Sequence, residues 1–185
     1  MIQAIAPALI LIDMQRGMSA AGLPPRNNAN AEANMERLLA AWRELQAPLV
    51  HVRHVSRTPG SPFWPGQEGI EFQAPFLPRS AEQLFEKNVP DAFIHSGLER
   101  WLRARGVERL VIVGVSTNNS VEATARMAGN LGFSVIVPCD ATFTFEKRDF
   151  NGVLRSADEV HAMSLANLAD EYAQIRTTSE VLRAL

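Results

Sequence analysis

The sequence predicts an α/β fold: a doubly wound parallel sheet of six strands in the order 3-2-1-4-5-6, with helices on both faces. Short, almost wholly apolar runs such as Pro7–Asp13 and Arg109–Val115 are typical of strands buried on both faces. Segments with helical spacing of apolar residues alternate with these runs, which indicates βαβ units with right-handed crossovers. Residues 1–185 contain no linker of the kind that separates domains, so we expect one domain of three layers, α/β/α.

The first half of the chain supplies three strands and one clear helix. After the strand Pro7–Asp13, five apolar residues within Asn30–Gln46 fall on one helix face. Pro48–Arg53 is the second strand, and Gln83–Lys87 is the third. Residues 56–80 are rich in Pro and Gly and show no period, so we expect either a lid or a loop held to the surface by its aromatic residues.

Capping boxes, in which Ser or Thr precedes Glu by three residues, predict three helix starts in the second half. The boxes begin at Ser96, Ser156 and Thr177. The helix from Ser156 is expected to run to about Tyr172, and the segment before it, up to Arg155, is expected to be a loop.

The remaining strands are also apolar runs. Arg109–Val115 is followed by residues 116–120 (Ser-Thr-Asn-Asn-Ser) and then by a helix to about Leu131. Phe133–Pro138 and Ala173–Arg176 complete the predicted sheet.

Composition predicts a soluble globular protein. Hydrophobic residues make up 46%, charged residues 21% and the net charge is −2, with no basic patch that would favour nucleic acid. The longest apolar run, near Ile5–Ile12, is far too short to span a bilayer and lacks the basic flank of a signal peptide. The single cysteine, Cys139, excludes an internal disulfide and fits a reducing compartment, so we expect a cytoplasmic protein.

Candidate catalytic residues follow from the rule that open parallel sheets bind ligands at the carboxyl ends of their strands. Asp13 ends the first strand, Lys87 ends the third, and Ser120 follows the fourth. At a helix start, free backbone N–H groups would favour an anion, and a hydroxyl there would be a nucleophile with a carboxylate as its base. The simpler interpretation stays open at this point: a helix cap, a solvated strand end and a structural carboxylate.

Three motifs carry a family resemblance. Asp13-Met14-Gln15 after an apolar strand, Lys87 followed by Phe93, and GVSTNNSVEATA over 114–125 together resemble the isochorismatase-like superfamily, over nearly the whole chain. This superfamily includes nicotinamidases, carbamoylsarcosine amidases, ureidoacrylate amidohydrolases and isochorismatases. The resemblance implies a hydrolase acting on a small-molecule substrate.

The same resemblance assigns roles to particular groups. Asp13 would be the general base and Lys87 the cation that polarises the site. A cis peptide at Val115–Ser116 would help to aim the backbone N–H groups of Ser116 and Ser120 at an oxyanion.

Ser120 departs from the family pattern, because this position usually holds a nucleophilic cysteine. A serine hydroxyl is a much weaker acid than a thiol and needs a base in the transition state. Three alternatives remain open: a serine nucleophile, an engineered replacement of the cysteine, or a reaction without a nucleophile. The leading hypothesis is hydrolysis of a C–N bond in a small amide, ureido or carbamoyl substrate. The alternatives are vinyl ether hydrolysis of the isochorismatase type, with Asp13 as proton donor, and a pseudoenzyme that only binds a small carbonyl ligand.

Further expectations concern the surroundings of this site. No cofactor and no metal are expected, since His51 and His54 lie three apart on a strand and point to opposite faces. His161 is expected to fill a core or interface position. The aromatic residues of the 56–80 loop predict a homo-oligomer, a dimer or tetramer, with that loop near the subunit boundary. The predicted substrate-binding residues are Gln15, Phe63, Trp64, Phe93 and Asn119.

Overall fold

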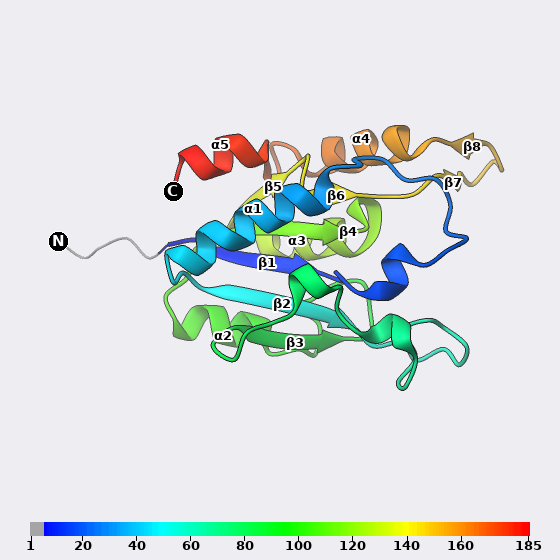
Figure 1. Cartoon of the computed structure of the whole chain (residues 1–185). Helices are drawn as coiled ribbons and strands as arrows, with labels where there is room; N and C mark the ends of the chain where they lie inside the picture. The colour runs from blue at the N-terminus through cyan, green and yellow to red at the C-terminus, as the bar shows by residue number, and fades with distance from the viewer. Residues whose placement is uncertain (1–5) are drawn as a thin grey trace.

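Within residues 6–185, which the structure describes, the main sheet has seven parallel strands. Six of them follow the order β3-β2-β1-β4-β5-β9, and the seventh, β6 (Thr142–Phe143), pairs with β4. Figure 1 shows this arrangement in the computed structural model, with the carboxyl ends of the strands on one side of the molecule. The sheet order is as predicted, with β9 as the sixth strand. The strands are β1 (Ala8–Ile12), β2 (Leu49–His54), β3 (Gln83–Lys87), β4 (Arg109–Val115), β5 (Ser134–Pro138) and β9 (Gln174–Arg176).

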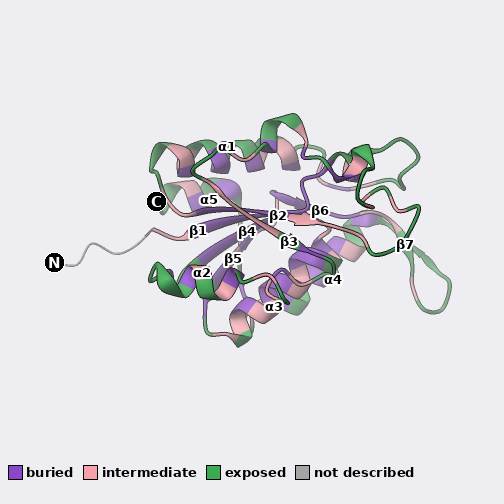
Figure 2. Cartoon of the chain, turned by 90° about the horizontal axis from the view of Figure 1, so that it is seen from below, coloured by how far each residue is buried: buried purple, intermediate pink, exposed green. Residues whose placement is uncertain are grey.

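Helices cover both faces of the sheet, as the α/β/α prediction requires. Figure 2 shows α1 (Ala31–Glu44) and α5 (Thr178–Arg183) on one face, with the other three helices on the opposite face. Those three are α2 (Leu98–Ala104), α3 (Glu122–Asn130) and α4 (Ala157–Leu168). In the described part of the chain, no helix has the length and apolar character needed to cross a membrane.

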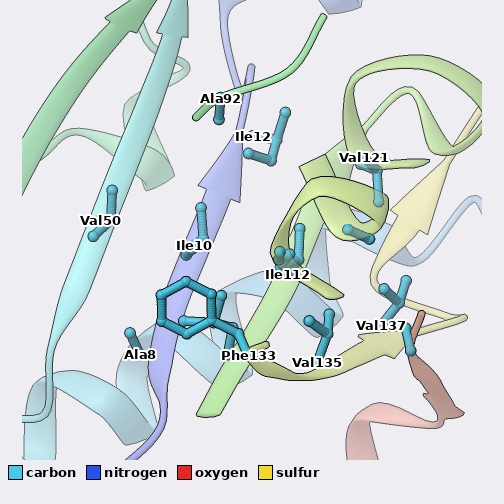
Figure 3. Packing of buried hydrophobic residues seen from close by; sticks show 14 of the residues in the cluster. Ala8, Ile10, Ile12, Val50, Ala92, Ile112, Val121, Phe133, Val135 and Val137 are labelled. Carbon is cyan, nitrogen blue, oxygen red and sulfur yellow. The ribbon is translucent and has the colours of Figure 1, made fainter. Parts of the chain in front are cut away.

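Strand β1 lies at the centre of the sheet, and this position explains why its sequence is apolar without interruption. Ala8, Ile10 and Ile12 pack into the cluster beneath α2, α3 and α4, which Figure 3 shows from close by. Leu9 and Leu11 face the other way and pack against α1. Both faces of the strand are therefore covered, so the polar alternation of a half-exposed strand is absent.

Two of the three predicted capping boxes are present. Ser156 accepts a hydrogen bond from the backbone of Glu159 at the start of α4, and Thr177 forms the same arrangement before α5. Helix α4 ends at Leu168, earlier than the predicted Tyr172.

The capping box predicted at Ser96 is wrong. Helix α2 begins one residue later than a Ser96 cap requires, after Gly97, whose φ of 78° places it in the left-handed region that glycine tolerates. The Ser96 hydroxyl accepts from the Leu98 N–H and donates to the Ala92 carbonyl. Glu99 pairs with Arg103 on the exposed side of the helix.

The segment predicted as a loop up to Arg155 contains three short strands. Strand β5 pairs with β4 only over Arg109–Val111, so the end of β4 is free to pair with β6 (Thr142–Phe143). Beyond it, β7 (Lys147–Arg148) and β8 (Leu154–Arg155) form an antiparallel hairpin.

The long 56–80 loop is held to the body of the protein by its own aromatic side chains. Phe72 and Phe76 are 5% and 0% exposed, and Phe76 belongs to the core cluster beneath α1. The loop also contains two short 3-10 helices, Glu68–Ile70 and Ala74–Phe76. Of the two alternatives for this segment, the structure favours the loop pinned by aromatic residues.

We expect Ser156→Ala to lower the free energy of unfolding by about 1 kcal/mol, because the first turn of α4 loses its cap. Urea unfolding would measure this change. Ser80→Ala, at an exposed site, is the matched control and should have almost no effect. Equal effects in both variants would contradict the capping role.

Candidate active site

Asp13, Lys87 and Ser120 lie together in the structure. The Lys87 ammonium donates to Asp13 Oδ2 at 2.7 Å and to Ser120 Oγ at 3.2 Å. The three residues are 1%, 3% and 6% exposed. A carboxylate, a cation and a hydroxyl thus form one connected group at the carboxyl edge of the sheet.

The sheet register places the first two of these residues. Asp13 leaves β1 with a φ of 55°, and its N–H donates to the Val52 carbonyl of β2 at 3.0 Å. Lys87 is the last residue of β3 and lies opposite His54 of β2 in the parallel register. Asp is one of the residue types that tolerate the left-handed region, which turns its side chain out of the strand direction.

A close approach between β1 and β4 places the third residue. Gly114 has a φ of 125°, and a Cβ at this position would meet the Ile12 carbonyl oxygen at 2.1 Å. Any side chain here would force the two strands apart next to Asp13. The next peptide, Val115–Ser116, is cis, as the resemblance implied. The chain then makes a π-helical turn over Thr117–Val121 that carries Ser120.

The charge balance of the group is unusual. Burial raises the pKa of Asp13 above its ordinary value of 3.8, although the Lys87 ammonium and the Ser120 hydroxyl oppose this change. Among the described residues, Asp13 Oδ1 is buried without a hydrogen-bond partner. This oxygen therefore accepts no hydrogen bond from the described residues. A buried acceptor of that kind costs free energy unless a proton or a ligand reaches it.

A set of buried polar contacts holds the π-helical turn from behind. His161 Nε2 lies 3.0 Å from the Cys139 carbonyl, which can only accept, so Nε2 carries the proton. His161 Nδ1 then accepts from the Thr117 hydroxyl at 2.9 Å. Burial lowers the pKa of His161, which favours this neutral form. The Ser164 hydroxyl, also on α4, reaches the Thr117 carbonyl at 3.0 Å. His161 therefore has a positioning contact beyond the core position expected for it.

A second contact holds the same turn from the side of β6. The Thr144 hydroxyl donates to Asn118 Oδ1, and the Thr144 N–H donates to Asn27 Oδ1 at 2.9 Å. Sequence reasoning missed these residues, because Thr144 and Asn27 lie far from the turn along the chain.

Gln15 lies at the site, and its side-chain amide already forms three hydrogen bonds within the protein. Both amide protons of its side chain are used, by the carbonyls of His54 at 2.9 Å and Ile70 at 2.8 Å. Its Oε1 accepts from the His54 N–H at 2.8 Å. Gln15 thus ties the 56–80 loop to the ends of β1 and β2, and its contact with a substrate stays a prediction.

Phe63 approaches the site through His54, which sequence reasoning considered only as a metal ligand. The two rings meet edge to face with centroids 5.9 Å apart. Burial and the nearby Lys87 ammonium lower the pKa of His54, while Asp13 raises it. The rule that selected Asp13 and Lys87 also selects His54, because it ends β2 at the same edge. Trp64 is half-buried next to Phe63, and its place in the pocket wall stays a prediction.

Phe93 packs against the core, whereas Asn119 is exposed at the surface. The Phe93 ring stacks on Phe133 with centroids 6.0 Å apart and packs against the core beneath α2, α3 and α4. This contact gives Phe93 a packing role, and its place in the pocket wall stays a prediction. Asn119 is exposed on the π-helical turn, and its role in substrate binding stays a prediction.

The described residues contain no group of three or more His, Cys, Asp or Glu side chains arranged to hold a metal ion. His51 points away from His54 and contacts Glu82, with 2.8 Å between His51 Nε2 and Glu82 Oε2.

Comparison with known proteins decides the family. The model of the isochorismatase domain matches residues 7–180. The chain belongs to the isochorismatase family. It is therefore an isochorismatase-family hydrolase with the α/β fold of that family.

Three similar proteins illustrate this relationship. An uncharacterised isochorismatase family protein of Bacillus subtilis, YrdC, is 37% identical over 95% of this chain and 94% of its own length. A crystal structure of an isochorismatase-family protein from Chromobacterium violaceum is 50% identical, with a TM-score of 0.94, over 96% of this chain and 92% of that one. Nicotinamidase 3 of Arabidopsis thaliana is 28% identical over 96% of this chain and 88% of its own length.

Because the pKa of Asp13 is raised, the free energy of unfolding of this isochorismatase-family chain should depend on pH. The folded protein holds the Asp13 proton to higher pH than the unfolded chain, so the stability that this proton provides is full below pH 3.8 and is lost as the pH rises through the folded-state pKa. Asp13→Asn has no proton to lose. We expect the stability of Asp13→Asn relative to the parent to increase with pH, as measured by urea unfolding from about pH 4 to about pH 8.

The change with pH is the quantity to compare, because the variant also leaves the Lys87 ammonium without its anion. Asp149→Asn is the matched control. The hydrogen bond from Arg155 lowers the pKa of Asp149, so this carboxylate is ionised in both states above about pH 5.5. Its effect should not vary between about pH 5.5 and about pH 8, and a flat result for Asp13→Asn over the same interval would contradict the raised pKa.

Proposed function

We propose that this protein hydrolyses a C–N bond in a small amide, ureido or carbamoyl substrate, with Ser120 as nucleophile, Asp13 as base and Lys87 assisting. The observation that carries the proposal is the buried Asp13–Lys87–Ser120 group with its unpartnered carboxylate oxygen. Ser120 Oγ accepts a hydrogen bond from Lys87, so the proton of the Ser120 hydroxyl remains available for transfer to another acceptor. Asp13 Oδ1 is the acceptor at hand that lacks a partner. The similarity to a nicotinamidase supports an amide as the substrate class.

In the first half of the proposed reaction, Ser120 Oγ attacks the substrate carbonyl carbon while its proton passes to Asp13. The carbonyl oxygen becomes an oxyanion, which we expect the backbone N–H groups of Ser116 and Ser120 to stabilise. The protonated Asp13 then gives its proton to the leaving nitrogen as the C–N bond breaks. An acyl ester on Ser120 and a free amine or ammonia result.

In the second half, Asp13 takes a proton from a water molecule that attacks the acyl ester. The C–O bond to Ser120 breaks, the proton returns to Ser120 Oγ, and the carboxylic or carbamic acid leaves. A group that acts first as base and then as acid works best with a pKa near the operating pH. Burial moves the pKa of Asp13 upward, in that direction. Lys87 keeps the Asp13 carboxylate and the Ser120 hydroxyl in fixed positions throughout.

The same raised pKa favours a second candidate, vinyl ether hydrolysis of the isochorismatase type. A carboxylic acid that keeps its proton to higher pH is a better proton donor, and that reaction needs Asp13 as a donor but no nucleophile. The two candidates differ in what they require of Ser120.

Burial of the reaction centre supports a small substrate in either case, because the three side chains are 6% exposed or less. Half-buried Phe63, Trp64 and the exposed Asn119 are proposed to contact the substrate at the entrance. A cytoplasmic location is proposed as well, on the ground of the single cysteine, which is unpaired.

Ser120→Cys tests the nucleophile. If the site performs acyl transfer, the variant should raise amide hydrolysis about tenfold or more, because a thiol loses its proton more easily and about 1.4 kcal/mol of barrier is a factor of ten. The measurement is kcat/KM against a panel of small amides, ureido acids and isochorismate.

Two further variants separate the candidates. Ser120→Ala should abolish amide hydrolysis but leave vinyl ether hydrolysis nearly unchanged, whereas Asp13→Ala should abolish both. Full activity of Asp13→Ala on any substrate found would overturn the assignment of the reaction centre. Ligand binding without turnover in both the parent and Ser120→Cys would identify a pseudoenzyme.

A further inference from the structure

Exposed apolar side chains gather on one face of the molecule, away from the 56–80 loop. Phe150, in the turn between β7 and β8, is 98% exposed, and Val153 and Leu154 beside it are 49% and 51% exposed. Met163 on the neighbouring helix α4 is 65% exposed. Figure 2 shows the hairpin extending from the body of the molecule near α4. A large aromatic ring left in water at a hairpin tip is the kind of feature that marks an interface.

Helix α4 carries apolar residues on both of its faces. Leu165 and Leu168 are buried against the sheet. Ala162, Met163 and Ala166 lie on the outer side, where a surface helix normally carries charged residues. An exposed apolar strip on the outer side of a surface helix is the kind of feature that marks an interface. Within the described chain, nothing covers the outer side beyond the hairpin itself.

A hollow of about 1150 Å³ lies between the hairpin and the outer side of α4. Its lining includes Phe150, Met163 and Ala166, and also Asn118 of the π-helical turn. We call the exposed apolar residues of the hairpin and of the outer side of α4 the hairpin–helix face. This face consists of Phe150, Val153, Leu154, Ala162, Met163 and Ala166.

The charges around the hairpin–helix face are complementary to each other. Lys147 and Arg148 on the hairpin are exposed, and neither forms an ion pair with any residue in the described range 6–185. Asp158, exposed in the first turn of α4, is likewise outside every ion pair of that range. A basic hairpin next to an acidic helix start fits a second copy of the same surface, turned through a half rotation.

We propose that a second copy of this chain docks on the hairpin–helix face about a two-fold axis. Each Phe150 enters the hollow of the other copy, and each basic hairpin lies over the partner's acidic helix start. The interface is isologous, because one patch supplies both the projecting ring and the hollow that receives it. The docked copy adjoins Asn118, two residues before Ser120, so it closes the outer side of the turn that carries the candidate nucleophile.

This interface lies on a different face from the one predicted at the 56–80 loop. That prediction rested on aromatic side chains that a single domain would leave uncovered. Phe72 and Phe76 are instead buried within the chain that carries them. Leu77 is the large apolar side chain that the described loop leaves exposed, at 55%.

Sedimentation equilibrium of the full chain tests the proposal. The parent should be a dimer or a higher oligomer at about 10 μM, while Phe150→Asp and Met163→Asp should each weaken association about 30-fold or more. Both side chains are mostly exposed, so the variants should keep the parent melting temperature in dilute solution. Leu77→Asp is the matched control and should associate like the parent. A monomeric parent, or dissociation by Leu77→Asp alone, would overturn the proposal.

Charge exchange tests the docking arrangement itself. Lys147→Glu and Asp158→Lys should each weaken association, and the double variant should recover it, because the exchanged charges again face opposite charges across the axis. A double variant that associates no more tightly than the single variants would rule out the hairpin-on-helix arrangement.

Discussion

The ion pair between Asp13 and Lys87 is the constraint on which the site depends. Removing two charges from water costs several kcal/mol for each ion, and only a close, well-oriented partner offsets this cost. The pair joins β1 to β3 across the intervening β2, so the three strands must end at the same level. Their parallel register does this, with Ile12 opposite Val52 and His54 opposite Lys87. The sheet is thus fixed at the edge where the chemistry is proposed, and the apolar core behind it supplies the rigidity.

From this pair outward, each part of the site is held by a different element. Lys87 holds Ser120, Gly114 allows β4 to approach β1, and α4 supports the turn through His161 and Thr117. The polar groups around the turn are mostly satisfied by one another. Asp13 Oδ1 is buried without a partner, as are Asn27 Nδ2 and Thr142 Oγ1 in the described chain. Of the three side chains at the reaction centre, Asp13 therefore has an unused acceptor that is available to a reacting group.

The parts of this structure that sequence could predict are those set by local chemistry. Apolar runs predicted the sheet, and the boxes at Ser156 and Thr177 predicted helix starts, because each depends on neighbouring residues. The box at Ser96 failed since Gly97 offers a left-handed turn that moves the helix start by one residue. Contacts between distant segments could not be predicted from the local sequence. Nothing near Gln15 in the chain indicates that its amide binds the backbone of the 56–80 loop. His54 could have been predicted, because it ends a strand at the same edge.

The serine at position 120 is easier to understand beside a carboxylate whose pKa is raised. A thiol can lose its proton before it attacks. A serine hydroxyl becomes a good nucleophile only when a base removes its proton in the transition state. A carboxylate in water is a weak base for that purpose. Burial makes the Asp13 carboxylate a stronger base, and the hydrogen bond from the Lys87 ammonium stabilises its buried negative charge. On the proposed function, desolvation of the base therefore compensates in part for the weaker acidity of the nucleophile, and the same residue then has a proton suited to the leaving nitrogen.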